Sequence, residues 1–544
     1  MPAKIPALFT ALALSVTLSA PAQTAASPAS ARAERAFLAA KKGGAPALYA
    51  FLKPFPKGAD LHMHLSGAIY AETFIAEGAA QNLCVDTAKL AFAKNTGTTK
   101  SIPPQAVCPA GAVPATAALQ DQQLYDRLVN SFSMRSFVPY AGFSGHDQFF
   151  TTFDRFRGLD NVAGEWLDEV ATRAAAQNEQ YLEIMQTPSF NHVFSAIAKS
   201  PWPAEFNDAN HMQVLAKYRD ALFANGLRDD VQIDAKELDD ALSAWSAHKP
   251  NPFALRDCAD PAKRGGIVAC PPGLGEVHIH FLYQVLRGFP PAQVFAQTLI
   301  GFELADGDPE QVVGINFVRA EDRRDAMAEY HTEMLMLDYL HSVYPKVHIS
   351  LHAGELAPGL VPTEGLRFHI REAVELGHAE RIGHGVDILH EDHPAELLKE
   401  MADKHVDVEI NLISNQGILG ITGSDHPLAA YRAAHVPFSL STDDEGVSRT
   451  DLTHNYVQAV LDQNLGYADL KLSARDSLEH SFLPGASLYL HTDDYVHRNA
   501  ACAAPIAATS FPPGPCKAFL AGSERATQQY ELERRFAVFE AATR

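Results

Sequence analysis

Basic residues are scarce in this sequence. Lys and Arg number 44 against 65 Asp and Glu, which gives the 544-residue chain a formal net charge of −21. Broad binding to nucleic acid or to an anionic membrane surface depends on clustered Lys and Arg. The composition therefore argues against both kinds of partner and fits the ordinary solubility of an exported protein.

Cysteine is also sparse, and no Cys-x-x-Cys occurs, so a zinc site built from cysteines is not expected. The six cysteines form three sequential couples, each inside a polar segment that contains Pro or Gly. An oxidising compartment favours disulfides, and free surface thiols are the alternative. We predict local pairing within each couple: Cys84 with Cys108, Cys258 with Cys270, and Cys502 with Cys516.

Only one apolar run resembles a targeting segment, and it stands at the N-terminus. Lys4 is the only early charge, residues 5–20 are apolar or small, and small-residue cleavage sites follow at residues 20–26. The run is short for a membrane span. We therefore predict a cleaved export signal over residues 1–26, and a periplasmic or secreted protein that has no membrane contact after cleavage.

Strand-like and helix-like patterns alternate along the rest of the chain. Hydrophobic residues make up 47% of the sequence, which is ample for a large core. Repeated strand–helix alternation predicts a parallel α/β sheet, and eight candidate strands in a chain of this length favour a closed (β/α)8 TIM barrel. The candidate strands are residues 60–65, 181–185, 276–282, 298–304, 347–352, 381–384, 406–412 and 437–442.

The predicted barrel spans residues 54–499, with insertions at about 84–118 and 246–275. A helical lead-in is predicted over residues 27–53. A Cys- and Pro-rich segment followed by a helix is predicted over residues 500–544. No internal repeat is present.

Three histidines and one aspartate could hold one metal ion. His62 and His64 are two apart on a predicted strand, so their side chains point to the same side. His352 and Asp443 follow apolar runs, where the strands of a barrel end and active sites form. Nitrogen and oxygen donors of this kind suit Zn²⁺, which lowers the pKa of bound water from about 15.7 toward about 7. We predict one zinc ion per chain.

Histidines and aspartates with this spacing can also have purely structural roles. His278 and His280 repeat the His-x-His spacing, but their strand continues without a Gly turn, so we predict that they are structural. Asp443 and Asp444 could be a solvated acidic turn or a helix N-cap. Glu355, His384 and Asp444 are spare beside the four donors, and they could supply an acid, a base and a further carboxylate.

At these residues the chain resembles the adenosine deaminase family, with its AMP deaminase and secreted growth-factor relatives. The motifs occur in the family's order and span about residues 54–456. They are residues 57–68, which contain His62-Met-His64, then His352-Ala-Gly-Glu355, Arg381-Ile-Gly-His-Gly385, Ile413-Ser-Asn-Gln416 and Ser441-Thr-Asp-Asp444.

The resemblance implies a role for each residue. The zinc ligands would be His62, His64, His352 and Asp443. Glu355 would protonate purine N1, and His384 would orient and deprotonate the zinc-bound water. Hydroxide would attack C6, Asp444 would hydrogen-bond N7, and ammonia would leave. The implied reaction converts adenosine to inosine and ammonia, and deoxyadenosine is expected to react in the same way.

Some positions depart from the family pattern. Ser66 stands where the family often has an Asp that contacts ribose. Asp306 and Gly307 compete for a backbone position beside purine N3, and Glu445 replaces a frequent Pro. Phe149, Phe150, Phe153 and Phe156 are spaced like a helical stripe, which either covers the nucleoside or packs on the barrel.

Three other functions compete with an adenosine deaminase. A binuclear amidohydrolase would need a Lys on the fourth strand, and residues 298–304 contain none. An AMP deaminase would need a phosphate pocket with several basic residues, and no convincing basic cluster is seen. A deaminase of a modified nucleoside stays an alternative. A secreted nucleoside-binding or signalling protein would tolerate loss of a ligand or of the acid, yet every proposed residue is present.

Overall fold

The computed structural model of the chain describes residues 27–100, 105–189, 193–247, 277–509 and 512–543. The predicted export signal and the Cys258/Cys270 couple lie outside these residues. Within them, no helix combines the length and the apolar character needed to cross a membrane.

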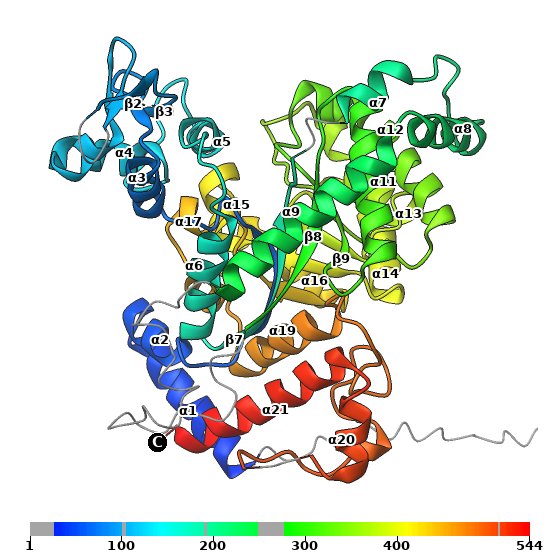
Figure 1. Ribbon diagram of the computed structural model, residues 1–544. Helices are drawn as coiled ribbons and strands as arrows, with labels where there is room; N and C mark the ends of the chain where they lie inside the picture. Colours follow the sequence, from blue (N-terminus) through cyan, green and yellow to red (C-terminus); the bar gives the residue numbers. More distant parts are fainter. Residues whose placement is uncertain (1–26, 101–104, 190–192, 248–276, 510–511, 544) are drawn as a thin grey trace, which may run out of the picture.

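The centre of the fold is a barrel of eight parallel strands that pair in chain order (Figure 1). Backbone hydrogen bonds close it: Asp443 N donates to His62 O at 2.8 Å, and His64 N donates to Asp443 O at 3.4 Å. The predicted TIM barrel is thereby confirmed. Its strands are β1 (Gly58–His64), β7 (Glu179–Gln186), β8 (His278–Leu286), β9 (Val312–Val318), β10 (His348–Ala353), β11 (Arg381–His384), β12 (Asp407–Ile410) and β13 (Phe438–Leu440).

The predicted strand at residues 298–304 is wrong. This stretch belongs to α11 (Pro291–Gly307), and the fourth strand is β9. Nearly every residue of α11 from Ala292 to Ala305 is buried. A helix that is covered on all sides lacks the one-sided apolar period that identifies a helix in a sequence, so its apolar run resembles a buried strand.

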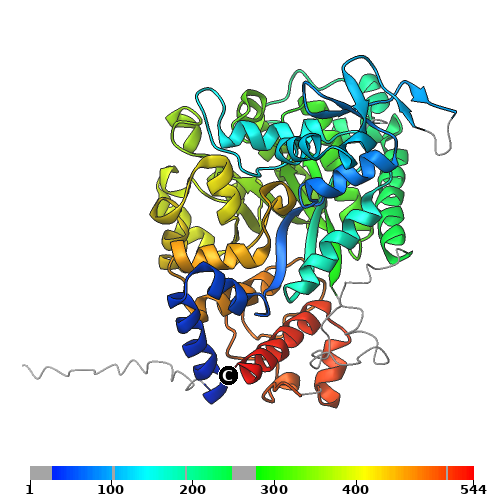
Figure 2. The ribbon, with the colours of Figure 1, turned by 90° about the vertical axis from the view of Figure 1, so that its left-hand side faces the viewer.

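Helices surround the barrel between the strands, as the alternation predicted. Figures 1 and 2 show them as an outer layer around the sheet. They include α6 (Ala163–Ala176), α9 (Leu227–Ala247), α12 (Arg324–Val343), α13 (His369–Glu375), α14 (Pro394–Asp403), α16 (Leu428–Ala433), α18 (Leu452–Asp462) and α19 (Tyr467–Glu479).

The two ends of the described chain lie together at the amino end of the barrel. The helices α1 (Pro28–Lys42) and α21 (Glu524–Ala542) contact each other and lie at the same end of the molecule in both views (Figures 1 and 2), and α2 (Ala45–Leu52) packs on α1 and α18. Helix α21 is hydrogen-bonded to the start of β7, because Gln180 Nε2 donates to Gln528 O at 2.8 Å and Arg535 Nη1 donates to Glu179 O at 3.2 Å. These terminal helices therefore cover the amino end.

The first insertion lies at the other end. After α3 (Ala71–Ala80) it forms a small antiparallel sheet from β2 (Cys84–Asp86), β3 (Ala91–Ala93) and β6 (Ala112–Pro114). The Cys84–Cys108 disulfide joins it as predicted. The chain continues through α4 (Gln122–Ser131) and α5 (Gly145–Arg155).

Helix α5 carries the aromatic stripe and packs against α15 (Leu412–Leu419) and α17 (Glu445–Ser448). Phe149 and Phe156 are buried, and Phe156 stacks on Phe74 with ring centroids 4.2 Å apart. Phe150 and Phe153 are half-buried at the edge of the core. The stripe therefore serves packing along most of its length.

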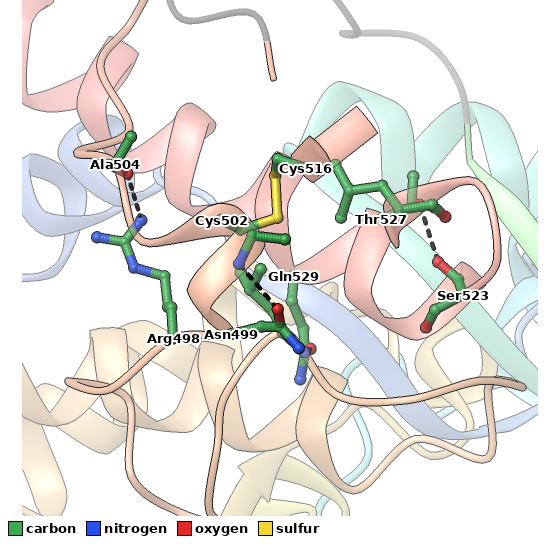
Figure 3. Close-up of a disulfide and its surroundings, with 11 residues drawn as sticks. Arg498, Asn499, Cys502, Ala504, Cys516, Ser523, Thr527 and Gln529 are labelled. Carbon is green, nitrogen blue, oxygen red and sulfur yellow. Dashed lines mark hydrogen bonds between the residues drawn. A yellow bond between two sulfur atoms is a disulfide. The ribbon is translucent and has the colours of Figure 1, made fainter. Parts of the chain in front are cut away.

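The C-terminal segment holds the second disulfide. Cys502, at the end of the short turn Ala500–Cys502, is bonded to Cys516 in α20 (Gly514–Leu520) (Figure 3). The turn is capped by Asn499, whose side-chain oxygen accepts from Ala501 N at 3.0 Å. The bond closes a loop with a sequence separation of 14, which restrains the unfolded chain by roughly 3 kcal/mol. Two of the three predicted pairings are thus confirmed.

Candidate functional site

Four buried donor groups meet at the carboxyl end of the barrel. His62 and His64 point inward from β1, His352 lies on β10, and Asp443 follows β13. One ligand atom of each lies within 4.8 Å of the others. His352 Nε2 lies 3.0 Å from His62 Nε2 and 3.2 Å from His64 Nε2. Asp443 Oδ1 lies 3.1 Å from His64 Nε2 and 3.6 Å from His62 Nε2.

The outer nitrogen of each histidine ring has an oxygen partner. His62 Nδ1 lies 2.5 Å from Glu409 Oε2 on β12. His64 Nδ1 lies 2.7 Å from Gln284 Oε1 on β8, and His352 Nδ1 lies 2.6 Å from Asn316 Oδ1 on β9. These oxygens can only accept, so each ring carries its proton on Nδ1 and directs the Nε2 lone pair toward the other two rings.

This arrangement fits a cation. Three lone pairs and a carboxylate oxygen that face each other at 3.0–3.6 Å repel one another unless positive charge lies between them. Three imidazole nitrogens with one carboxylate oxygen are a donor set typical of zinc, and each histidine already has the outer hydrogen bond that orients a ligand.

Asp443 and Asp444 point in different directions from one turn. Asp443 has a left-handed backbone, with φ +62°, and its Oδ2 accepts from Ser414 Oγ at 2.6 Å. Asp444 packs against the Cα of Gly67, where any Cβ would lie 1.3 Å from Asp444 Oδ1. That oxygen is buried and has no hydrogen-bond partner among the described residues. Burial and the neighbouring Asp443 raise the pKa of Asp444 well above its usual range.

Glu355 lies beside the four donors without belonging to them. Its carboxylate groups with His384 and Asp443, and its Oε1 is 3.9 Å from His384 Nδ1. Burial first, and then the charges of Asp443 and Glu321, raise the pKa of Glu355 well above the ordinary carboxyl value. Glu355 is therefore poised to hold a proton at neutral pH and to donate it.

His384 is fully buried, and burial lowers its pKa to about 3. A chain of hydrogen bonds leads to it from backbone: Leu428 N donates to His426 Nδ1, and His426 Nε2 donates to Asn415 Oδ1 at 3.1 Å. Asn415 Nδ2 donates to His384 Nδ1 at 2.9 Å. The neutral ring of His384 consequently carries its proton on Nε2, which is buried and has no partner among the described residues.

Two of the predicted substrate residues lie elsewhere. Asp306 and Gly307 are exposed at the C-terminal end of α11. The chain enters β9 from there, so this position is at the amino end of the barrel, opposite the four donors. The error follows from the wrong strand, because a helix antiparallel to the strands delivers its last residues to the far end. Ser66 lies in the turn directly after His64 and is half-buried.

Several residues of the site were not found from the sequence: Glu409, Asn316, Gln284, Arg287 and Glu321. Each stands within a barrel strand or just after it. The available signal was a polar or charged residue at the carboxyl end of an apolar run, as in Asn316-Phe-Val-Arg-Ala-Glu321. For Glu321 that signal was hidden because β9 was not recognised.

Comparison with known proteins agrees with this site. Residues 297–488 match the family model described as adenosine deaminase, and this range contains His352, Glu355, His384, Asp443 and Asp444. An adenosine deaminase of Clostridium perfringens is 33% identical over 135 residues, which are 25% of this chain and 37% of the relative. The chain thus spans well under half of that relative's length.

The solved structures that align with this one include the adenine deaminase from Arthrobacter aurescens, at 16% sequence identity and a TM-score of 0.46. The alignment covers 79% of this chain and 94% of that chain. Another is the N6-methyl-AMP deaminase from Arabidopsis thaliana, at 20% identity and a TM-score of 0.48, covering 80% of this chain and 94% of that one.

Proposed function

Because this chain belongs to the adenosine deaminase family, we propose that it removes the 6-amino group of a purine nucleoside by hydrolysis, with adenosine as the substrate. The observation that carries the proposal is the convergence of three imidazole lone pairs and Asp443 beside the buried Glu355, whose pKa is raised by burial. A metal site alone is common to many hydrolases. The acid next to it suits a reaction in which a ring nitrogen must be protonated.

One zinc ion, held by His62, His64, His352 and Asp443, would supply the Lewis acidity that makes water nucleophilic near pH 7. The protein's own part begins with Glu355. Its proton passes to purine N1, which makes C6 more electrophilic. Of the two protons of the water that adds to C6, one passes to the 6-amino group, which leaves as ammonia, and the other returns to Glu355. Burial keeps the proton for N1 on Glu355 until the substrate arrives.

His384 and Asp444 place the reactants. With its proton on Nε2, His384 donates a hydrogen bond to the oxygen of the attacking water and holds it against C6. Uptake of the water proton at Nε2, which the resemblance implied, would require Asn415 to turn its amide over. Asp444, with one buried oxygen free among the described residues, faces purine N7; its raised pKa lets it donate there.

Nucleosides are better supported than nucleotides as substrates. A phosphate pocket needs several basic side chains near the reacting group. The segments that follow β1, β10, β11 and β13, namely residues 65–70, 354–362, 385–393 and 441–448, contain neither Lys nor Arg. Arg287 and Arg319, which follow β8 and β9, are hydrogen-bonded to backbone carbonyls. We also propose that the mature protein acts outside the cytoplasm, because residues 1–26 have the composition of an export signal.

A substrate panel tests the reaction. Zinc-replete protein is incubated with adenosine, deoxyadenosine, AMP, N6-methyladenosine and adenine, and the ultraviolet spectrum and the released ammonia are followed. Turnover of adenosine and deoxyadenosine above the other three is expected. Folded protein with one zinc ion per chain that changes none of the five would contradict the proposal.

Glu355→Gln separates the acid from the metal. The variant should retain one zinc ion and its melting temperature, because Glu355 is not among the four donors. Its kcat should fall by about 10²- to 10⁴-fold, because the amide cannot protonate N1. Zinc content by elemental analysis and steady-state kinetics check both parts. Loss of the metal would show that Glu355 is a ligand.

Ser66→Asp tests the sugar contact. If Ser66 faces the ribose, a carboxylate there accepts stronger hydrogen bonds from the sugar hydroxyls, and KM for adenosine should fall several-fold with kcat nearly unchanged. An unchanged KM would place the ribose elsewhere.

A further inference from the structure

A buried ion pair lies behind the turn that carries Glu355. Arg287 follows β8 and Glu321 follows β9; both side chains are almost fully buried, and Arg287 Nη2 lies 3.7 Å from Glu321 Oε2. Among the described residues, neither side chain is hydrogen-bonded to the side chain of one of the four metal donors. Both are instead bonded to the backbone of the segment from His352 to Glu355.

The carboxylate of Glu321 holds two successive amides of that segment. Gly354 N donates to Glu321 Oε1 at 3.1 Å, and Glu355 N donates to Glu321 Oε2 at 2.9 Å. Two neighbouring N–H groups point the same way in a tight turn or at a helix N-terminus, but not in an extended strand. Here Gly354 takes φ +75°, and a Cβ on it would lie 2.4 Å from Asp387 Oδ1 and 2.7 Å from Ile370 Cδ1.

The same pair fixes the start of the segment. Arg287 Nη1 donates to His352 O at 3.1 Å, and Arg287 Nε donates to Arg319 O at 3.2 Å. His369 Nδ1 is hydrogen-bonded to Glu321 Oε1. Although burial alone would raise it, the charge of Arg287 and the contact with His369 lower the pKa of Glu321 to about 2. Glu321 is therefore a charged acceptor at every working pH.

We propose that Glu321 is a positioning residue for Glu355: by holding the amides of Gly354 and Glu355, its carboxylate sets the direction in which the acid's side chain leaves the backbone. The hydrogen bonds of Glu321 among the described residues go to Gly354, Glu355 and His369 and not to the side chains of the metal donors, so it acts on the reaction through Glu355. The proposal rests on the proposed function, since Glu355 must be the acid for its direction to matter in turnover.

Glu321→Gln is the direct test. The amide of Gln offers one acceptor oxygen in place of two, so one of the two N–H groups loses its partner and the turn relaxes. The variant should keep one zinc ion per chain. Its kcat for adenosine should fall about 10- to 100-fold, and its KM should stay within about twofold, because the substrate contacts are untouched.

Glu391→Gln is a matched control. Glu391 Oε1 also accepts from two successive amides, Ile370 N at 2.6 Å and Arg371 N at 3.4 Å, but these belong to the start of α13. This variant should lower the melting temperature and leave kcat unchanged. If both variants lose kcat alike, Glu321 serves general stability and the proposal fails.

A double-mutant cycle with Glu355→Gln decides whether Glu321 acts through Glu355. Once the acid is removed its direction no longer matters, so Glu321→Gln should cost less than about twofold more in that background. A loss as large as in the wild type would overturn the proposal. If Glu321→Gln does not fold, Glu321→Asp keeps the charge but shortens the reach to the amides, and the same cycle applies.

A crystal structure of Glu321→Gln gives a readout that needs no activity. The Glu355 carboxylate should move away from His384 and Asp443, while the four donors stay in place. A Glu355 that keeps its position overturns the inference. If the wild type deaminates none of the purines, the proposed function has failed, and this structural readout still decides whether Glu321 directs Glu355.

Discussion

Two His-x-His pairs lie on strands of the same barrel, and their imidazoles contact different groups. His62 and His64 end β1 at the carboxyl end, whereas His278 and His280 begin β8 at the amino end. The Nε2 atoms of the first pair converge on His352 and Asp443. The second pair faces a single carboxylate, Glu524 of α21, at 3.4 and 3.8 Å. Spacing puts two imidazoles on one side of a strand, and the end of the barrel decides what they meet.

The amino end shows that many histidines do not make a metal site. A cavity of about 500 Å³ there is lined by His341, His378, His405 and His480, among others. His378 is paired with Asp338 at 2.9 Å, and His405 and His480 share Asp493 at 2.7 Å each. Each of these three rings has a carboxylate as its partner, and Asp493 serves two of them. At the carboxyl end the carboxylate and amides bind Nδ1, which leaves Nε2 free to converge.

The largest expected effect comes from removing one histidine of each pair. His62→Ala takes away a metal donor, so it should lose bound zinc and reduce kcat/KM by at least about a thousandfold. His278→Ala takes away a partly exposed ring paired with Glu524, so it should keep zinc and activity and lose less than about 1 kcal/mol of stability. Elemental analysis, kinetics and thermal melting check the pair. Equal loss of zinc in both variants would erase the distinction between the two ends.

The sequence pointed to the four candidate donors because each lies in or just after a run that ends a predicted strand, and the structure brings their ligand atoms together. It was also sufficient for the barrel, since apolar runs in the sequence predict seven of its eight strands. It failed at α11 and β9, because a helix buried on all sides lacks a helical period. That single error displaced the purine N3 contact to Asp306 and Gly307 and concealed Glu321.

The partners of the donors were out of reach for another reason. Glu409, Gln284 and Asn316 stand on β12, β8 and β9, and each bonds a histidine from another strand. Which polar side chain meets which ring depends on the register between strands around the whole barrel. The pattern within one strand shows which face a side chain lies on, but not which residue of another strand it meets.

A smaller effect is expected at the amino end of the barrel, where histidines paired with carboxylates should stabilise the fold to an extent that depends on pH. Although burial opposes it, the hydrogen bond to Asp493 and the charge of Asp407 raise the pKa of His480 from 6.5 to about 9. A raised folded-state pKa gives stability that is complete below pH 6.5 and is lost as the pH rises through about 9. The stability of wild type over His480→Gln should therefore reach at most roughly 3 kcal/mol at pH 6 and vanish near pH 10.

Denaturant unfolding of both proteins across that pH range measures the difference. His405→Gln is the control, because His405 shares Asp493 but is half exposed, so it should contribute less than about 1 kcal/mol. A difference between wild type and His480→Gln that does not change with pH would mean that His480 is neutral in the folded protein.

The smallest effect tests what makes the first pair a metal site. Glu409 is fully buried between His62 and Arg381; burial alone would raise its pKa, but Arg381 and His62 hold it at about 2. Glu409→Gln keeps an oxygen for His62 Nδ1 and removes the negative charge that strengthens the ring as a ligand, so zinc affinity should fall about 10- to 100-fold.

Asp407→Asn is the control. Asp407 lies two residues earlier on the same face of β12, and its carboxylate is bonded to Ser439 rather than to a ligand, so the zinc affinity of this variant should match the wild type. Competition with a chelator measures all three proteins. If Glu409→Gln and Asp407→Asn bind zinc equally well, the convergence of the Nε2 atoms is sufficient by itself, and the charge behind His62 belongs to the stability of the barrel interior.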